Sequence, residues 1–265
     1  MTAPAVVIVA RGSTDPDVAQ VTHTMRQGIS ALRPELVVRA AFLDHCSPTG
    51  PQVVAQLVKQ KVNEIVLVPL QLTHAIESDP EVEQLLLRLR TAHPFTRFTV
   101  SRPVGPEVSL LTILDERLRS ALRLARALEL DGLVLSSECP GDVRGNALLA
   151  RRARQWSAHH KLPCLTAVAD GSGPSTAQAI QGLRAQGRRH IAVGSFFLTA
   201  DECYHAQAEL SYRFGAVAVS EPLGAHREVI DLVLARYAFA AMDLLDFGAA
   251  EDAGPAARHL SVVAG

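Results

Sequence analysis

The sequence predicts an α/β protein of two tandem doubly wound domains, each with a four-stranded parallel sheet. One observation is an internal repeat at a constant offset of 126 residues, a pattern typical of duplicated structural units. A second is that apolar runs alternate with segments of helical periodicity, which indicates βαβ units. The repeated segments are residues 6–10, 41–44 and 65–68, which fall on residues 132–136, 167–170 and 191–194.

The first half opens with a continuous apolar, β-branched run at residues 6–10 that ends at a Gly-Ser turn. Such a run is typical of a strand buried on both faces of a parallel sheet. Pro80 favours the first turn of a helix. The predicted order is strand 6–10, helix 17–32, strand 36–43, helix 52–61, strand 64–70, helix 80–90, strand 98–102 and helix 110–128.

The second half repeats this order but is about seven residues shorter between its third and fourth strands, because Pro103-Val104-Gly105 matches Pro222-Leu223-Gly224 at an offset of 119. We expect a site-bearing domain at residues 1–126, a degenerate repeat at 127–247 and a flexible Ala/Gly-rich tail at 248–265. The predicted elements are strand 132–136, helix 146–159, strand 163–169, helix 175–186, strand 190–197, helix 206–214 and strand 216–220.

Composition excludes several classes of protein. The net charge is −1 and only 5% of the residues are aromatic, so neither nucleic acid nor a membrane is an expected partner. The sequence has no apolar run long enough for a membrane span and no secretory leader pattern, which predicts a cytoplasmic protein. The four cysteines form no C-x-x-C pair, which favours reduced thiols over a disulfide framework or a zinc ribbon.

The predicted site lies where strands of the first half end, because ligands bind outside the carboxyl ends of parallel strands. Four loops meet at that edge and bring together a guanidinium, two imidazoles, a thiol and several carboxylates. They are residues 11–15, 44–46, 73–79 and 103–105.

Several of these residues have more than one interpretation. Arg11 is either a surface arginine or a cation facing the cleft, and Ser13 suits both a helix cap and an anion site. His74 is either a solvated loop histidine or, with Glu77, a group that binds a divalent metal or moves a proton. Asp79 precedes Pro80, so a capping role is the simpler interpretation of that carboxylate.

The order and spacing of these segments resemble the class II metal chelatases of the sirohydrochlorin cobaltochelatase/ferrochelatase type. The resemblance covers roughly residues 5–245. It rests on the Gly-Ser turn followed by Asp15-Pro16, on residues 41–44 with Pro48, on residues 65–70, on the histidine loop before Asp79-Pro80, and on residues 103–106 and 221–226. It implies a chelatase-like fold in which one chain builds what smaller relatives build by dimerising, hence a monomer or weak homodimer.

The resemblance also implies an activity. Members of the family insert Fe2+, Co2+ or sometimes Ni2+ into a carboxylate-rich tetrapyrrole, with the metal as substrate and no organic cofactor. Two histidines usually bind the metal and accept the pyrrole protons. His74 matches the second of them, whereas Arg11 replaces the first. Arginine has no acceptor and stays protonated, but it binds carboxylates in bidentate fashion.

The resulting prediction assigns catalysis and metal binding to His74 and Glu77, the latter from its chemistry alone. It assigns binding of the tetrapyrrole to Arg11, Gly12, Ser13, Asp44 and His45. Two alternatives remain: a chelatase scaffold that binds a tetrapyrrole or metal without insertion, and an enzyme of another class on the same fold. In the second half, Cys139 and Cys203 with Glu202 and His205 form a less favoured candidate metal site.

Overall fold

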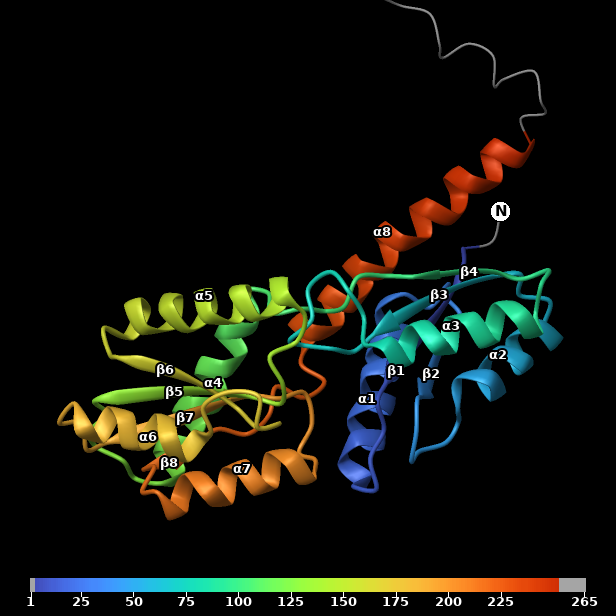
Figure 1. Ribbon diagram of the computed structural model, residues 1–265. Helices are drawn as coiled ribbons and strands as arrows, with labels where there is room; N and C mark the ends of the chain where they lie inside the picture. Colours follow the sequence, from blue (N-terminus) through green and yellow to red (C-terminus); the bar gives the residue numbers. More distant parts are fainter. Residues whose placement is uncertain (1–2, 253–265) are drawn as a thin grey trace, which may run out of the picture.

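The computed structural model describes residues 3–252 and contains two four-stranded parallel sheets with helices packed around them (Figure 1). The strand orders are β2-β1-β3-β4 and β6-β5-β7-β8, so both sheets have the same doubly wound topology. The predicted fold class is therefore confirmed, including the number and parallel direction of the strands.

The first half contains four strands, each followed by a helix, at positions close to those predicted. The elements are β1 (Ala5–Ala10), α1 (Pro16–Leu32), β2 (Val38–Phe42), α2 (Gly50–Lys59), β3 (Glu64–Pro69), α3 (Pro80–Ala92), β4 (Arg97–Val100) and α4 (Leu110–Leu124).

The second half repeats this arrangement. Its elements are β5 (Gly132–Ser137), α5 (Val143–His160), β6 (Cys164–Val168), α6 (Thr176–Ala185), β7 (Ile191–Phe196), α7 (Glu202–Arg213), β8 (Ala218–Val219) and α8 (Arg227–Asp252). Helix α8 was not predicted from the sequence. This helix also continues beyond residue 248, where a flexible tail was expected, while residues 253–265 lie outside the described part of the chain.

Strand β1 shows why the apolar runs predict a parallel sheet. Val6 and Ile8 face one hydrophobic core, Val7 and Val9 face another, and none of the four is more than 2% exposed. The first core continues into the second half through residues such as Leu133. The two sheets therefore share one core on their inner sides, and each has a separate core on its outer side.

Each sheet with the helices packed on it forms one lobe of the molecule, and α4 and α8 each pack on the sheet of the other half of the chain. Helix α4 packs against β7 and β8 of the second sheet, and α8 packs against β3 and β4 of the first. In Figure 1, α8 (red) leaves the second lobe and runs beside the first sheet. Each half of the chain therefore contributes its last helix to the sheet of the other half.

Most of the length difference between the repeats falls in one loop. Residues 70–79 connect β3 to α3, whereas only residues 197–201 connect β7 to α7. The longer loop carries His74, so the extra residues of the first half lie at the predicted site. Among the described helices, none is long and apolar enough to cross a bilayer.

Candidate functional site

A small cavity of about 80 Å³ lies where the carboxyl ends of strands from both sheets meet. Arg11 follows β1 and His74 follows β3, as predicted. Glu138 and Cys139 follow β5, so the second half contributes to the cavity as well. The polar side chains that line it are Arg11, Gln71, Thr73, His74, Asp79, Glu138 and Cys139, and apolar residues of both halves complete the wall.

Arg11 is anchored at the start of α3. Its Nη2 lies 2.5 Å from Oδ2 of Asp79, and its Nη1 lies 4.0 Å from Oε1 of Glu81. The other oxygen of Asp79 accepts the backbone N–H of Glu81 at 3.1 Å, which caps the helix. Burial works against the charge of Arg11, but Asp79, Glu81 and Glu138 outweigh it, so its pKa is raised. Arg11 thus presents a permanent positive charge at one wall of the cavity.

Gly12 allows the loops after β1 and β2 to touch. The backbone N–H groups of Leu43 and Asp44 both donate to the carbonyl of Arg11, at 3.2 and 3.0 Å. Gly12 has φ of +98°, and a Cβ atom there would lie 2.0 Å from the carbonyl oxygen of Asp44. Glycine is required here both by its backbone conformation and by the close approach of the two loops.

The His74 loop is held by a carboxylate of the second half. Asp142 accepts the backbone N–H groups of Ala75, Ile76 and Glu77 at 3.2, 2.8 and 2.9 Å, and it also caps α5. Burial opposes the charge of Asp142, but these donors outweigh it and lower its pKa to about 2. One side chain therefore fixes the loop that carries His74 to the N-terminus of α5.

We expect Asp142→Asn to destabilise the protein by about 1–2 kcal/mol at pH 7, because an amide replaces the carboxylate that accepts these donors. A carboxyl whose pKa is lowered on folding stabilises the protein above its unfolded pKa, here 3.8, and loses that effect as pH falls toward about 2. Urea unfolding should show a smaller difference in unfolding free energy between the wild type and Asp142→Asn at pH 2.5 than at pH 7. Asp231→Asn, which alters an exposed pair with Arg227, is the control. A difference that is independent of pH would contradict the assignment.

His74 itself is partly buried, and its Nδ1 is a buried atom that has no hydrogen-bond partner within the described residues. Buried polar atoms are nearly always paired, and His74 lines the cavity, so this unpaired nitrogen makes His74 a candidate ligand. The hydroxyl of the preceding Thr73 lies 3.1 Å from Sγ of Cys139. That contact joins the β3 loop to the β5 loop directly beside His74.

The other predicted site residues lie outside this cavity. The side chain of Glu77 is exposed, and His45 is also exposed, 3.6 Å from Asp44. Ser13 accepts the backbone N–H of Asp15 at 3.0 Å, a local turn contact. Gly12 lines an adjoining cavity of about 70 Å³ that it shares with Arg11 and Glu138.

Glu138 also lines the cavity, although its sequence pattern predicted no role for it. It lines both cavities, at their solvent-exposed edge. Desolvation there raises the pKa of Glu138, and Asp201 raises it further, while Arg11 acts in the opposite direction. The internal repeat could have pointed to Glu138, because the offset of 126 residues aligns it with Gly12 in the turn after the first strand.

The thiols of the second half do not assemble the alternative metal site. Desolvation raises the pKa of Cys139, and desolvation with nearby carboxylates raises the pKa of Cys203 to about 12. Both thiols therefore ionise less readily than an ordinary cysteine, which disfavours the thiolate form that metals bind. Within residues 3–252, no group of three closely spaced metal-binding side chains includes these cysteines, His74 or Glu77.

Comparison with known proteins finds related sequences. Residues 5–121 match the CbiX family model. A stretch of 82 residues is 28% identical to the sirohydrochlorin cobaltochelatase of Methanopyrus kandleri and covers 31% of this chain. The match spans only 57% of the length of that relative.

Solved structures show the same fold over nearly the whole chain. SirB from Bacillus subtilis with Fe3+ aligns with a TM-score of 0.73 and 19% identity, over 90% of this chain and 96% of that structure. CbiX, the terminal enzyme for biosynthesis of siroheme in denitrifying bacteria, aligns with a TM-score of 0.58 and 20% identity, over 89% of this chain and 99% of that structure. The predicted chelatase-like fold is therefore confirmed.

Proposed function

Because residues 5–121 match the CbiX family model, we propose that this chain is a class II chelatase that inserts a divalent metal into a sirohydrochlorin-type tetrapyrrole. Co2+ and Fe2+ are the proposed metals. The observation that carries the proposal is the cavity between the lobes, where His74, Arg11 and Glu138 meet. These residues offer a metal-binding nitrogen, a cation that could hold a substrate carboxylate, and a carboxylate that could accept a proton.

Metal insertion releases two pyrrole protons as the metal forms bonds to the ring nitrogens. We assign metal binding to His74, whose Nδ1 is unpaired, and once the metal has moved to the ring nitrogens the lone pair that held it would accept the first of these protons. Arg11 occupies the position of the other histidine and accepts no proton. Glu138 lies at the same cavity, and its raised pKa makes its ionised form a stronger base than an ordinary carboxylate, so we assign the second proton to it.

Arg11 is the proposed partner of a substrate carboxylate. Its side chain is 53% exposed and already paired with Asp79, so a substrate carboxylate would share or replace that partner. The turn residues Gly12 and Ser13, together with Asp44 and His45, are proposed to contact the substrate at the rim. Glu77 is proposed as a second metal ligand at the exposed edge of the same loop, where it would meet the ion before His74 does.

The cavity of about 80 Å³ is much smaller than the roughly 300–1,000 Å³ of usual small-molecule sites. The proposal therefore requires the lobes to separate when the macrocycle binds, as in other enzymes that close on a substrate. Contacts of the β1–α1 segment with the second half would have to open. Thr14 donates to Glu202 at 2.8 Å, and the backbone N–H of Ala200 donates to Asp17 at 2.7 Å.

An anaerobic assay with sirohydrochlorin and Co2+ or Fe2+ tests the proposal. We expect the wild-type protein to convert the absorption spectrum of the free macrocycle into that of the metallated product, and Arg11→Ala to raise KM for the macrocycle. If the wild-type protein metallates sirohydrochlorin no faster than buffer, with Ni2+ included among the metals, the proposed activity is wrong.

A second candidate function is binding of a tetrapyrrole without insertion. The replacement of a family histidine by Arg11 favours it, because an arginine binds carboxylates but supports neither metal binding nor proton removal. Optical titration with sirohydrochlorin and with its metallated form separates the two functions. Spectral shifts without turnover, together with insertion activity in Arg11→His, would favour the binding protein.

A further inference from the structure

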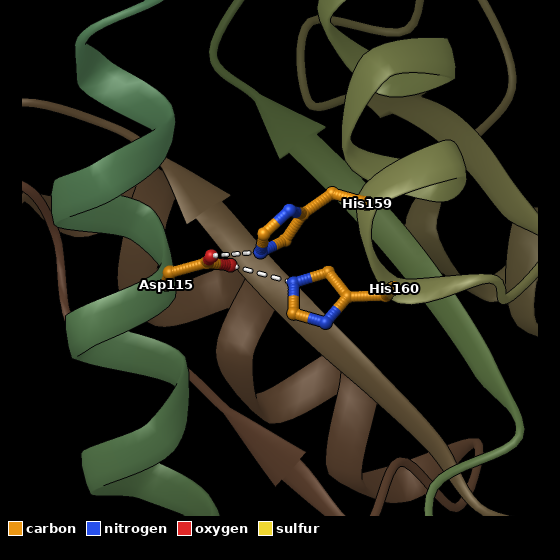
Figure 2. Close-up of side chains that lie close together, drawn as sticks. All are labelled: Asp115, His159 and His160. Carbon is orange, nitrogen blue, oxygen red and sulfur yellow. Dashed lines mark hydrogen bonds and ion pairs between the residues drawn. The ribbon is translucent and has the colours of Figure 1, made fainter.

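A carboxylate and two imidazoles converge outside the cavity between the lobes, where α4 meets the C-terminal end of α5 (Figure 2). Nε2 of His160 lies 2.7 Å from Oδ1 of Asp115, and Nε2 of His159 lies 3.6 Å from Oδ2 of the same carboxylate. One ligand atom from each residue lies within 4.8 Å of the other two. None of the three lines the cavity between the lobes.

The carboxylate of Asp115 is held in place by its surroundings. Asp115 is only 9% exposed, and the indole N–H of Trp156 donates to its Oδ1 at 2.6 Å. The ring of His160 packs edge-on against the rings of both Trp156 and His159, with centroids 5.7 and 4.9 Å away. A hydrogen bond from outside the ligand set and fixed ring orientations are what orient ligands in known metal sites.

The spacing of these atoms suits one small cation. Bonds of about 2.0–2.1 Å to imidazole nitrogen and carboxylate oxygen place tetrahedral ligand atoms roughly 3.3 Å apart, close to the 3.6 Å between His159 and Asp115. The 2.7 Å contact of His160 with Asp115 is a hydrogen bond, which a bound ion would replace as the two atoms move apart. The side chain of His159 is 65% exposed, which gives an ion a path from solvent. Arg119 is the nearby competing cation, with Nη2 3.9 Å from Oδ2 of Asp115.

We propose that Asp115, His159 and His160 form a second metal site for a divalent ion that prefers nitrogen and oxygen ligands, such as Zn2+, Co2+ or Ni2+. Three protein ligands leave a fourth position for water. Asp115 belongs to α4, which the first half contributes, whereas the two histidines belong to α5 of the second half. A bound ion would therefore fasten the exchanged helix α4 to the second lobe, independently of any activity in the cleft.

The chain contains its own reporter for this site, because Trp156 is its only tryptophan and donates directly to Asp115. The probe is Ni2+, followed through the fluorescence of the metal-free full-length protein, with Zn2+ as competitor. We expect Ni2+ to quench the emission in a saturable way and Zn2+ to reverse the quenching. His159→Gln should weaken Ni2+ binding by about tenfold or more.

Two further variants separate this site from others. His190→Gln alters a partly exposed histidine beside Glu129 and should show the same Ni2+ quenching of Trp156 as the wild type. His74→Ala, which removes the proposed ligand in the cavity between the lobes, should also leave this quenching unchanged. Zn2+ should also raise Tm in the wild type but not in His159→Gln. If Ni2+ leaves Trp156 emission unchanged, or if His159→Gln binds as tightly as the wild type, the proposed site is wrong.

Discussion

His74→Ala is expected to lower the rate of metal insertion by about 100-fold or more, the range for loss of a positioned acid–base group. The expected cause is the loss of the imidazole whose Nδ1 has no partner among the described residues and which lines the cavity between the lobes. An anaerobic assay that follows the absorbance of sirohydrochlorin with Co2+ measures the rate. Stability should change little, because His74 lies in a loop whose backbone is held by Asp142.

Addition of imidazole to His74→Ala should restore part of the activity, because the truncated side chain leaves space at the cavity for the free base. His93→Ala is the matched control, since His93 lies at the far end of α3 from Asp79 and should retain full activity. If His74→Ala inserts metal at the wild-type rate, then His74 neither binds the metal nor accepts a proton.

Much of the fold was predictable from local patterns. The apolar run of β1 faces a core on each side of its sheet, and such a run has few other stable environments in a protein of this composition. Caps such as Asp79 before Pro80 set helix starts that the sequence already showed. The positions of α4 and α8 were not predictable, because an apolar helix face specifies that it is buried but not which of two similar sheets it covers.

The site was predictable only in part, for the same reason. Arg11 and His74 follow strands of one sheet, so parallel topology alone brings them to one edge. Glu138 and Asp142 reach that edge from the other lobe, and no pattern within one repeat determines how two lobes face each other. Glu77 failed to line the cavity because its backbone, and not its side chain, is directed toward Asp142.

Glu138→Gln is expected to reduce metal insertion about 100-fold while leaving the protein at least as stable at pH 7. The first effect follows from the loss of a proposed proton acceptor. The second follows from the raised pKa of Glu138, which is caused by desolvation and by Asp201. A carboxyl whose pKa is raised on folding stabilises the protein below its unfolded pKa, and that effect is lost as pH rises through the folded value.

At pH 7 the charge of Glu138 is therefore unfavourable to folding, and glutamine removes it. The effect on stability should be small, because the side chain reaches water. Insertion rates across pH and thermal unfolding at pH 5 and 8 measure both effects, with Glu209→Gln as control, since Glu209 forms an exposed pair with Arg213. Glu138→Asp should keep part of the activity and shift its acidic limb.

If Glu138→Gln loses activity but keeps or gains stability, then Glu138 serves the reaction and not the folding of the protein. If Glu138→Gln instead loses stability together with activity, the residue supports the structure, and the second proton must leave by another route. If Glu138→Gln keeps both, the second half supplies the wall of the cavity but none of its chemistry, and His74 alone would have to serve both proton transfers.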